Sequence, residues 1–228
     1  MQDRVMLITG ASSGIGAATA RAAAREGHRL ILAARSTERL DTLARELGPE
    51  KVMTVTLDVT SLAAQQAMVE QALERFGRID AVFANAGRGG SPGGFSGADH
   101  EAWRDMILTN IYGVGLTVQA TLPALRRSRG HMLLTGSAAG RATIPGSMYG
   151  ATKWAVTGIG YNLREELRGS GIRVTLIEPG MVDTPFFDEP PEHALEPRDI
   201  ANAVIYAVNQ PAHVDINEIL VRPTPPVE

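Results

Sequence analysis

Cysteine is absent from the sequence, and its absence excludes disulfides, a thiolate nucleophile and cysteine-ligated metal sites. Histidine is scarce: the 5 histidines include no pair at the spacing of metal ligands, so we expect no metal site. The lack of cysteine also agrees with a reducing compartment, and we expect a cytoplasmic protein.

A strong excess of charge and long apolar runs are lacking as well. The formal net charge of -3 offers no electrostatic attraction to nucleic acid or to an anionic membrane, so we expect neither as a partner. No apolar run approaches the length of a membrane-spanning helix. The N-terminal stretch MQDRVMLITG passes from charged residues into a short apolar strand, without the pattern of a signal peptide. This composition favours a small diffusible molecule as the partner.

The sequence does contain an alternation of β-rich runs and helical patterns over its whole length. The expected strands lie at residues 5–9, 29–34, 51–57, 80–87, 131–137, 172–180 and 218–222. The expected helices cover about 14–26, 37–48, 62–77 and 99–125, then the segment that holds Tyr149 and Lys153, and a last helix that starts near Pro197. Several strands are nearly continuous apolar runs, as in a parallel sheet covered on both faces. The pattern predicts the α/β class, with one domain over residues 1–228 built on a single Rossmann-type, doubly wound parallel sheet with helices on both faces.

A glycine-rich turn, TGASSGIG, connects the first expected strand to the first helix through Gly10, Gly14 and Gly16. Glycines at such a turn let the backbone approach a pyrophosphate, and the helix N-terminus offers unpaired N–H groups. The spacing is G-x-x-x-G-x-G rather than the standard G-x-G-x-x-G, and a glycine turn can also be a simple connector. Its place in the first βα unit favours nucleotide binding.

The end of the second strand indicates which dinucleotide is bound. An acidic residue at this place would bind the ribose 2′-hydroxyl of NAD, but the sequence reads ILAARS, with Ala34 and Arg35. A guanidinium is suited to the 2′-phosphate of NADP, so we expect NADP as the cofactor, although Arg35 could also be an ordinary surface cation.

Tyr149 and Lys153, in YGATK, are four residues apart on an expected helix and therefore share one face of it. A nearby cation favours the phenolate, so Lys153 could bring the tyrosine pKa into working range. Alone, the pair could equally be two neighbours on a solvated helix.

With these motifs together, the chain resembles the classical short-chain dehydrogenases/reductases over nearly its whole length. The matching motifs follow in the family's order: TGASSGIG, LDVT at 57–60, NAG at 85–87, TN ending at Asn110, GS ending at Ser137, YGATK, and PGMVDT at 179–184. The resemblance implies a cofactor site made of Gly10, Ser12, Ser13, Gly14, Ile15, Gly16, Arg35, Asp58, Val59, Asn85, Ala86, Gly87, Tyr149, Lys153, Pro179, Gly180, Val182 and Thr184.

The resemblance also implies a reaction, in which a hydride passes between the nicotinamide and a carbonyl carbon while Tyr149 exchanges a proton with the oxygen. Lys153 would lower the pKa of Tyr149 and bind the nicotinamide ribose, Ser137 would hold the substrate oxygen, and Asn110 would support a water-linked proton path. These four are the expected catalytic residues. Hydride transfer to a carbonyl builds negative charge on oxygen, which a proton donor and fixed hydrogen-bond donors stabilise.

Two of the cofactor residues have a structural alternative. Asp58 could cap the following helix, and Asn85 could serve only the architecture of the sheet edge. Ser13 stands where one NADP-preferring subset of the family has a basic residue, so the expectation of NADP rests mainly on Arg35.

The substrate side is less well defined. The lid implied by the family, at about residues 181–197, is short, and the expected pocket is mostly apolar. It comprises Ser137, Ala139, Ile144, Met148, Tyr149, Met181, Phe186 and Phe187. Arg88 and Arg141 are the nearby cations that could serve a carboxylate. We expect a small to medium carbonyl compound or alcohol as substrate; the ending HVDINEILVRPT, similar to that of NADP-dependent 3-hydroxy acid and serine dehydrogenases, supports those as the alternative.

A protein of another class, a dinucleotide sensor or scaffold without turnover, would have no need of the tyrosine and lysine pair. The complete set of expected catalytic residues therefore favours an enzyme. The family's usual mode of association implies a homodimer or homotetramer, formed through the helical regions at 103–122 and 154–167.

Overall fold

The computed structural model describes residues 4–90, 92–187, 189 and 191–225. Seven parallel strands form one sheet in the order β3-β2-β1-β4-β5-β6-β7. The strands are β1 (Val5–Thr9), β2 (Arg29–Ala34), β3 (Val52–Thr56), β4 (Ala81–Ala84), β5 (His131–Thr135), β6 (Arg173–Pro179) and β7 (Glu218–Val221). The predicted fold class is confirmed.

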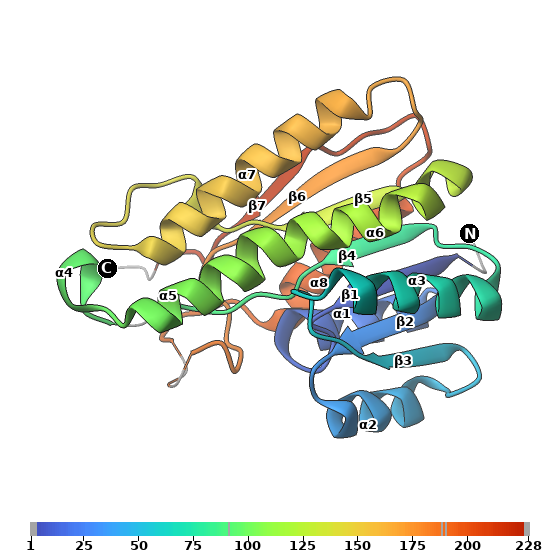
Figure 1. Cartoon of the computed structure of the whole chain (residues 1–228), viewed down its shortest axis with the longest axis horizontal. Coiled ribbons are helices and arrows are strands. Elements are labelled where there is room, and N and C mark those ends of the chain that lie inside the picture. The colour runs from blue at the N-terminus through green and yellow to red at the C-terminus, as the bar shows by residue number, and fades with distance from the viewer. Residues whose placement is uncertain (1–3, 91, 188, 190, 226–228) are drawn as a thin grey trace.

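Helices cover both faces of the sheet (Figure 1). One face carries α3 (Leu62–Phe76), α6 (Gly113–Ser128) and α7 (Met148–Glu166). The other face carries α1 (Gly14–Arg25), α2 (Thr37–Leu47) and α8 (Pro197–Asn209). The strands supply both cores by alternation: in β1, Val5 and Leu7 join the first cluster, while Met6 and Ile8 join the second.

The chain reverses direction across the sheet between β1 and β4. From β1 it builds outward through β2 and β3, then returns to place β4 on the other side of β1. In open α/β sheets this reversal leaves a crevice at the carboxyl ends of the strands, where ligands bind. Gly10 follows β1 and Asn85 follows β4, so the glycine turn and the NAG motif meet at this crevice.

Local signals in the sequence set several helix ends. Ser61 caps α3 by accepting a hydrogen bond from the Ala64 N–H, and Gly77 ends that helix in the left-handed region at a φ of 75°. Pro197 stands at the start of α8, behind a reciprocal cap between Glu196 and Asp199.

The helical region expected at 99–125 is present and consists of three consecutive parts. They are α5 (His100–Ile107), a π-helical turn η1 (Leu108–Tyr112), and α6. A short helix, α4 (Gly94–Gly97), also lies inside the glycine-rich segment after β4. A π-turn adds a residue to the helical repeat and is common at functional sites. Here it contains Asn110, whose side-chain contacts are described below.

The lid segment predicted at 181–197 is fixed at both ends, while residues 188 and 190 lie outside the described residues. Val182 and Leu195 form a parallel bridge, the Asp183 N–H donates to the Leu195 carbonyl at 2.8 Å, and the Leu195 N–H donates to the Met181 carbonyl at 2.9 Å. The Val182 side chain is buried in the core on the α1 and α8 face.

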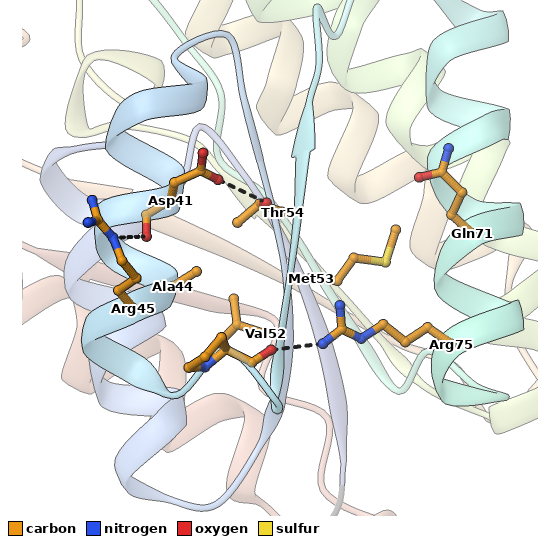
Figure 2. Close-up of a pocket in the computed structure, with 9 residues that line it drawn as sticks. Asp41, Ala44, Arg45, Val52, Met53, Thr54, Gln71 and Arg75 are labelled. Atoms are coloured by element: carbon orange, nitrogen blue, oxygen red, sulfur yellow. Dashed lines mark hydrogen bonds between the residues drawn. The ribbon is translucent and has the colours of Figure 1, made fainter.

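A hollow of about 570 Å³ lies at the β3 edge of the sheet, between α2 and α3 (Figure 2). Asp41 and Arg45 border it on α2, Thr54 on β3, and Arg75 on α3. Several of its polar groups are bound within the protein: Thr54 donates to Asp41 at 3.3 Å, and Arg75 donates to the Pro49 carbonyl at 2.9 Å. None of the predicted site residues lines this hollow.

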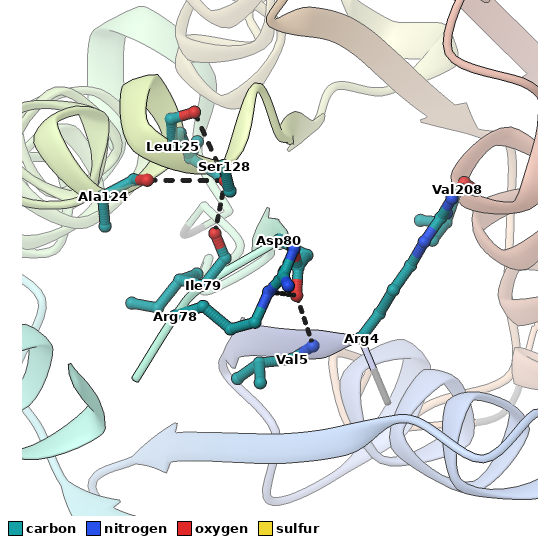
Figure 3. Close-up of polar contacts among 9 residues, drawn as sticks. All are labelled: Arg4, Val5, Arg78, Ile79, Asp80, Ala124, Leu125, Ser128 and Val208. Atoms are coloured by element: carbon teal, nitrogen blue, oxygen red, sulfur yellow. Dashed lines mark hydrogen bonds and ion pairs between the residues drawn. The ribbon is translucent and has the colours of Figure 1, made fainter. Parts of the chain in front are cut away.

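At the amino ends of the strands, opposite the carboxyl ends where ligands bind, a separate set of polar contacts stabilises the sheet (Figure 3). Arg78 forms a forked pair with the carboxylate of Asp80, which also accepts the Val5 N–H at 2.9 Å. Arg4 donates to the Val208 carbonyl at 2.9 Å, near the end of α8. These contacts tie β1, β4 and α8 together, away from the ligand-binding edge of the sheet.

Candidate active site

The glycine turn after β1 is tightly folded. Gly10 and Gly14 have φ angles of 66° and 50°, in the region that side chains disfavour. A Cβ atom on Gly16 would lie 2.3 Å from the Gly10 carbonyl oxygen, and one on Gly10 would lie 2.9 Å from the Ala86 Cα. The three glycines are therefore needed for the turn itself and for its contact with the NAG segment.

The N-terminus of α1 suits a phosphate group. Ser13 is the N-cap residue, but its hydroxyl makes no capping hydrogen bond, and the first turn holds no acidic residue. The first N–H groups of a helix have no partner within the helix. Ser12, Ser13 and Ile15, at this end of α1, are partly exposed. Thr184, from the segment after β6, contacts Gly14, where an added Cβ would be 3.1 Å from its Cγ2 atom. The donors of the turn fit the pyrophosphate of a dinucleotide.

Asn85 connects the glycine turn to the centre of the sheet. Its side-chain amide donates to the Thr9 carbonyl at 3.1 Å and accepts a hydrogen bond from Thr135 Oγ1 at 3.2 Å. The Thr9 hydroxyl in turn accepts the Asn85 and Ala86 N–H groups, at 3.0 and 3.1 Å. The Asn85 side chain is thus used within the protein, which agrees with the structural alternative for this residue.

Arg35 and Asp58 lie just beyond the carboxyl ends of β2 and β3. Hydrogen bonds from the Thr60 N–H and hydroxyl are the main cause that lowers the pKa of Asp58. The charge of Arg35, which is exposed, makes a smaller contribution in the same direction. The side-chain cap of the next helix is Ser61, so the alternative that Asp58 caps it is wrong. Val59 is buried and packs against Gly113, where an added Cβ would be 2.8 Å from its Cγ2 atom.

Tyr149 and Lys153 share one face of the first turns of α7, as their spacing predicts. The Lys153 Nζ lies 5.7 Å from the centre of the Tyr149 ring and donates to the Thr135 carbonyl at 2.8 Å. The Lys153 side chain is only 5% exposed, and burial lowers its pKa to about 8. Gly87, at the end of the NAG motif, lies near this ammonium, because a Cβ atom added to Gly87 would be 3.9 Å from the Lys153 Nζ.

The pKa of Tyr149 differs from the expectation. Burial raises it, and the hydrogen bond with Ser137 opposes that rise, so the protein alone does not bring the phenol toward ionisation. Burial of the phenol is the larger influence on its pKa, and the Lys153 ammonium donates to the Thr135 carbonyl. A raised pKa keeps the phenol protonated at neutral pH.

Ser137 lies between β5 and a short 3-10 turn, η2 (Ala138–Gly140). Its hydroxyl accepts the Ala139 N–H at 3.1 Å and donates to the Pro179 carbonyl at 3.3 Å. Pro179 ends β6, and the following Gly180 donates its N–H to the Val221 carbonyl at 2.7 Å. The structure therefore brings Ser137, Tyr149 and the PG motif together at one edge.

Asn110 is 1% exposed, and its side chain is fully bound within the protein. Its Oδ1 accepts the Arg88 N–H at 2.9 Å, and its Nδ2 donates to the Arg88 carbonyl at 3.0 Å and to Thr152 Oγ1 at 3.1 Å. Thr152 passes the link on, because its hydroxyl donates to the Tyr149 carbonyl at 2.8 Å. The Asn110 amide thus joins the π-turn, the loop after the NAG motif and helix α7.

Three threonines of this network were not predicted from the sequence: Thr9, Thr135 and Thr152. Two of them end strands β1 and β5, and the third precedes Lys153. Threonine at a strand end is common, so residue type gave no signal. Thr9 is the first residue of TGASSGIG, Thr135 directly precedes GS, and Thr152 lies within YGATK, which was the available signal.

Aromatic side chains border Tyr149 on the substrate side. The Phe186 ring lies 5.5 Å from the Tyr149 ring, and the Phe187 ring lies 5.3 Å from that of Phe186. An added Cβ on Gly89 would be 3.3 Å from the Phe186 ring, so that glycine leaves room for it. Of the other expected pocket residues, Ala139 is buried, Met148 is partly buried, and Ile144 and Met181 are exposed.

Both cations that were expected near the substrate are paired with carboxylates of the protein. Arg88 pairs with Asp105 at 2.7 Å. Arg141 pairs with the buried Glu178 at 2.7 Å and with Glu218 at 2.7 Å. Within the described part of the chain, no group of three or more histidine, aspartate or glutamate residues is placed to hold a metal ion, and no helix is long and apolar enough to cross a membrane.

Comparison with known proteins places this geometry in context. A family model described as short chain dehydrogenase matches residues 4–194. An uncharacterized oxidoreductase of Staphylococcus saprophyticus is 42% identical, with 98% of each chain covered. An alcohol dehydrogenase of the archaeon Thermococcus sibiricus, solved with 5-hydroxy-NADP, is 35% identical over 100% of both chains, with a TM-score of 0.91. A serine dehydrogenase solved in its closed form with NADP+ is 34% identical, with 95% of this chain and 94% of that chain covered and a TM-score of 0.88.

Proposed function

Because the chain belongs to the short-chain dehydrogenase family and is an oxidoreductase of that family, we propose that it interconverts a carbonyl group and a secondary alcohol with NADP as cofactor. The observation that carries this proposal is the arrangement at the carboxyl edge of the sheet. The hydroxyls of Ser137 and Tyr149 are in contact, and Lys153 lies one helical turn further on. The NAG segment lies between them and the glycine turn, because it contacts Gly10 at Ala86 and lies near Lys153 at Gly87.

Each residue has a chemical task in this proposal. When bound, the nicotinamide supplies or accepts the hydride. Tyr149 gives its proton to the developing alkoxide in reduction, and its raised pKa keeps that proton in place at neutral pH. Ser137 donates a hydrogen bond to the same oxygen. Lys153 holds the ribose side of the cofactor, and Asn110 fixes the loop and the helix that frame the site.

The proposed cofactor site follows the predicted residues. The N-terminus of α1 takes the pyrophosphate, and exposed Arg35 takes the 2′-phosphate of the adenosine. The NADP-type ligands of the two solved relatives support this choice. We further propose that residues 1–228 form one domain, in which the segment at 181–197 acts as the lid; residues 188 and 190 of it lie outside the described part.

The substrate we propose is a small to medium apolar ketone, aldehyde or secondary alcohol. The rings of Phe186 and Phe187 supply an apolar wall next to Tyr149, and the nearest guanidinium groups, on Arg88 and Arg141, are paired with carboxylates. A second candidate is a 3-hydroxy acid dehydrogenase of the serine type. The likeness to serine dehydrogenase and the ending HVDINEILVRPT favour it.

The decisive experiment is a panel of carbonyl compounds and alcohols, assayed by nicotinamide absorbance with NADPH, NADH and their oxidised forms. Tyr149→Phe should keep cofactor binding and lose about 10²–10⁴-fold in turnover, because it removes a positioned proton donor. The matched control is Tyr206→Phe, at an exposed tyrosine on α8. Near-normal turnover by Tyr149→Phe would refute the acid/base assignment, and binding without turnover by the parent protein would favour the sensor.

Two further measurements separate the finer alternatives. Arg35→Asp should narrow or reverse the preference for NADPH, by about ten- to a hundredfold in affinity, with the exposed Arg127→Asp as control. Equal kcat/KM for NADPH and NADH in the parent would contradict the NADP proposal. A 3-keto acid should be no better a substrate than its methyl ester. A preference for the acid above about a hundredfold would instead indicate the hydroxy-acid function.

We also propose that the protein forms a homodimer or homotetramer through the helical regions at 103–122 and 154–167. Trp154 and Tyr161 are seven residues apart on α7 and both exposed, and Tyr112 on the neighbouring π-turn is exposed as well. Light scattering after size-exclusion chromatography tests this, and a monomer at micromolar concentration would contradict it.

A further inference from the structure

Arg141 follows the turn that Ser137 opens, and its side chain connects three elements. Its Nε donates to Glu178 Oε1 on β6 at 2.7 Å, to a carboxylate side chain only 1% exposed. Its second terminal nitrogen lies 2.7 Å from Glu218 Oε1 on β7, and its first donates to the Tyr161 hydroxyl on α7 at 2.6 Å. One guanidinium therefore joins the turn η2 to two strands and to the catalytic helix.

Both ends of η2 are attached to the same stretch of β6. At its start, the Ser137 hydroxyl donates to the Pro179 carbonyl. At its end, Arg141 is bound to Glu178, the residue before Pro179. Gly136, the residue before Ser137, also packs against the Glu178 side chain, because a Cβ atom added to Gly136 would be 3.0 Å from the Glu178 Cγ atom.

The inner side of η2 is packed directly on α7. A Cβ atom on Gly140 would lie 2.7 Å from the Lys153 carbonyl oxygen. The Thr157 hydroxyl donates to that same carbonyl at 3.2 Å and reaches the Gly140 carbonyl at 3.5 Å. The turn is thus held between the catalytic helix and β6, and the Arg141 ion pair is its strongest polar attachment.

We propose that Arg141, together with Glu178, is a positioning residue that fixes the Ser137 hydroxyl relative to Tyr149. The inference rests on the proposed function, in which Ser137 holds the substrate oxygen. A hydroxyl stabilises a developing alkoxide only when its direction is set in advance, and a small displacement is costly in rate. A buried carboxylate bound to a forked guanidinium provides such a fixed geometry.

The test is a double-mutant cycle between the ion pair and Ser137. The pair is replaced as R141Q/E178Q, because the loss of Arg141 alone would leave the Glu178 carboxylate buried without its partner. We expect kcat/KM to fall about tenfold in the parent background and less than about twofold in the Ser137→Ala background. The ratio of the two losses, about five- to tenfold, corresponds to a coupling of about 1–1.4 kcal/mol.

The matched control is Arg78→Gln, which breaks a forked pair with Asp80 at the opposite edge of the same sheet (Figure 3). It should change kcat/KM less than twofold in both backgrounds. Equal losses from R141Q/E178Q in the two backgrounds would overturn the positioning role and leave the pair a purely structural one. An unchanged kcat/KM in Ser137→Ala alone would refute the proposed role of Ser137 itself, and the inference with it.

A second variant keeps the test valid if the double replacement fails to fold. Arg141→Lys retains a cation for Glu178 but gives up the fork that also reaches Tyr161 and Glu218. It should show the same dependence on Ser137, with a smaller loss. A kcat/KM equal to that of the parent would contradict a role for the guanidinium geometry.

Discussion

Replacing Lys153 by Met should change how the stability of the protein depends on pH. The Lys153 ammonium is buried, donates to the Thr135 carbonyl, and has a pKa lowered by burial to about 8. Desolvation is the cause of this shift, and no carboxylate contributes to it. The folded protein therefore holds a cation where its surroundings disfavour one, as is common at functional sites.

The size of the effect follows from the two pKa values. Between about pH 8 and the unfolded value of 10.5, the unfolded chain binds a proton that the folded protein lacks, so stability falls as the pH is lowered through this window. Below about pH 8 both states hold the proton, and the cost levels off at roughly 3 kcal/mol, since one pKa unit is about 1.4 kcal/mol. Met has no charge to bury, and its loss of the hydrogen bond to Thr135 adds a nearly constant offset.

The assay is urea unfolding of the protein without cofactor between pH 7 and 9.5. The unfolding free energy of Lys153→Met relative to the parent should fall by about 2 kcal/mol across this range, because the parent recovers most of its cost as the pH rises. Lys51 is the other lysine of the chain and is exposed, so Lys51→Met should show a constant difference. A difference for Lys153→Met that does not vary with pH would refute the burial argument.

Two more predictions test the polar network and the amino edge of the sheet. Thr152→Val should lower kcat about tenfold and leave cofactor affinity within twofold, because the Asn110 amide loses one of its partners. The control Thr121→Val removes an equally buried hydroxyl that is bonded to helix carbonyls, and it should leave kcat unchanged. Steady-state kinetics of the two variants tests this prediction, and equal effects on kcat would contradict it. Burial, with the charges of Arg173 and Arg4, lowers the pKa of His131, so the unfolded chain takes up a proton below about pH 6.5 that the folded protein refuses. Stability should therefore fall as the pH drops below about 6.5, and His131→Gln should remove part of that fall. An unchanged acid profile in denaturant titrations would show that His131 is not responsible.

The sequence was sufficient to predict the sheet, because its strands are short apolar runs and its helices carry their own end signals. Ser61, Gly77 and Pro197 each stand at a helix end where capping chemistry places them. The spacing of Tyr149 and Lys153 predicts their shared face, which the structure shows. These are local properties, and a period of two or 3.6 residues expresses them directly.

The pairings of charged side chains could not be predicted, because they depend on distant segments meeting in space. Arg141 is separated by 37 residues from Glu178, its partner in the ion pair, so the sequence offered it as a substrate cation. The prediction that Lys153 lowers the pKa of Tyr149 also failed on contacts between distant segments. Burial raises that pKa, and the Lys153 ammonium donates to a carbonyl of strand β5. The π-turn at 108–112 also escaped, since a one-residue change in helical repeat leaves the apolar pattern almost intact.

Most polar side chains of the candidate site are bonded within the protein, whereas the Tyr149 hydroxyl contacts another side chain of the site, Ser137. The amides of Asn85 and Asn110 and the hydroxyls of Thr9 and Thr152 are each used in contacts within the protein. Such groups are costly to bury unpaired, so a satisfied network gives the edge of the sheet one geometry. The Tyr149 hydroxyl stands apart, because its polar contact is with Ser137, the residue that the proposed function places at the substrate oxygen. In the proposed function, this framework fixes where a carbonyl oxygen binds, and the hydroxyls of Ser137 and Tyr149 carry out the chemistry on it.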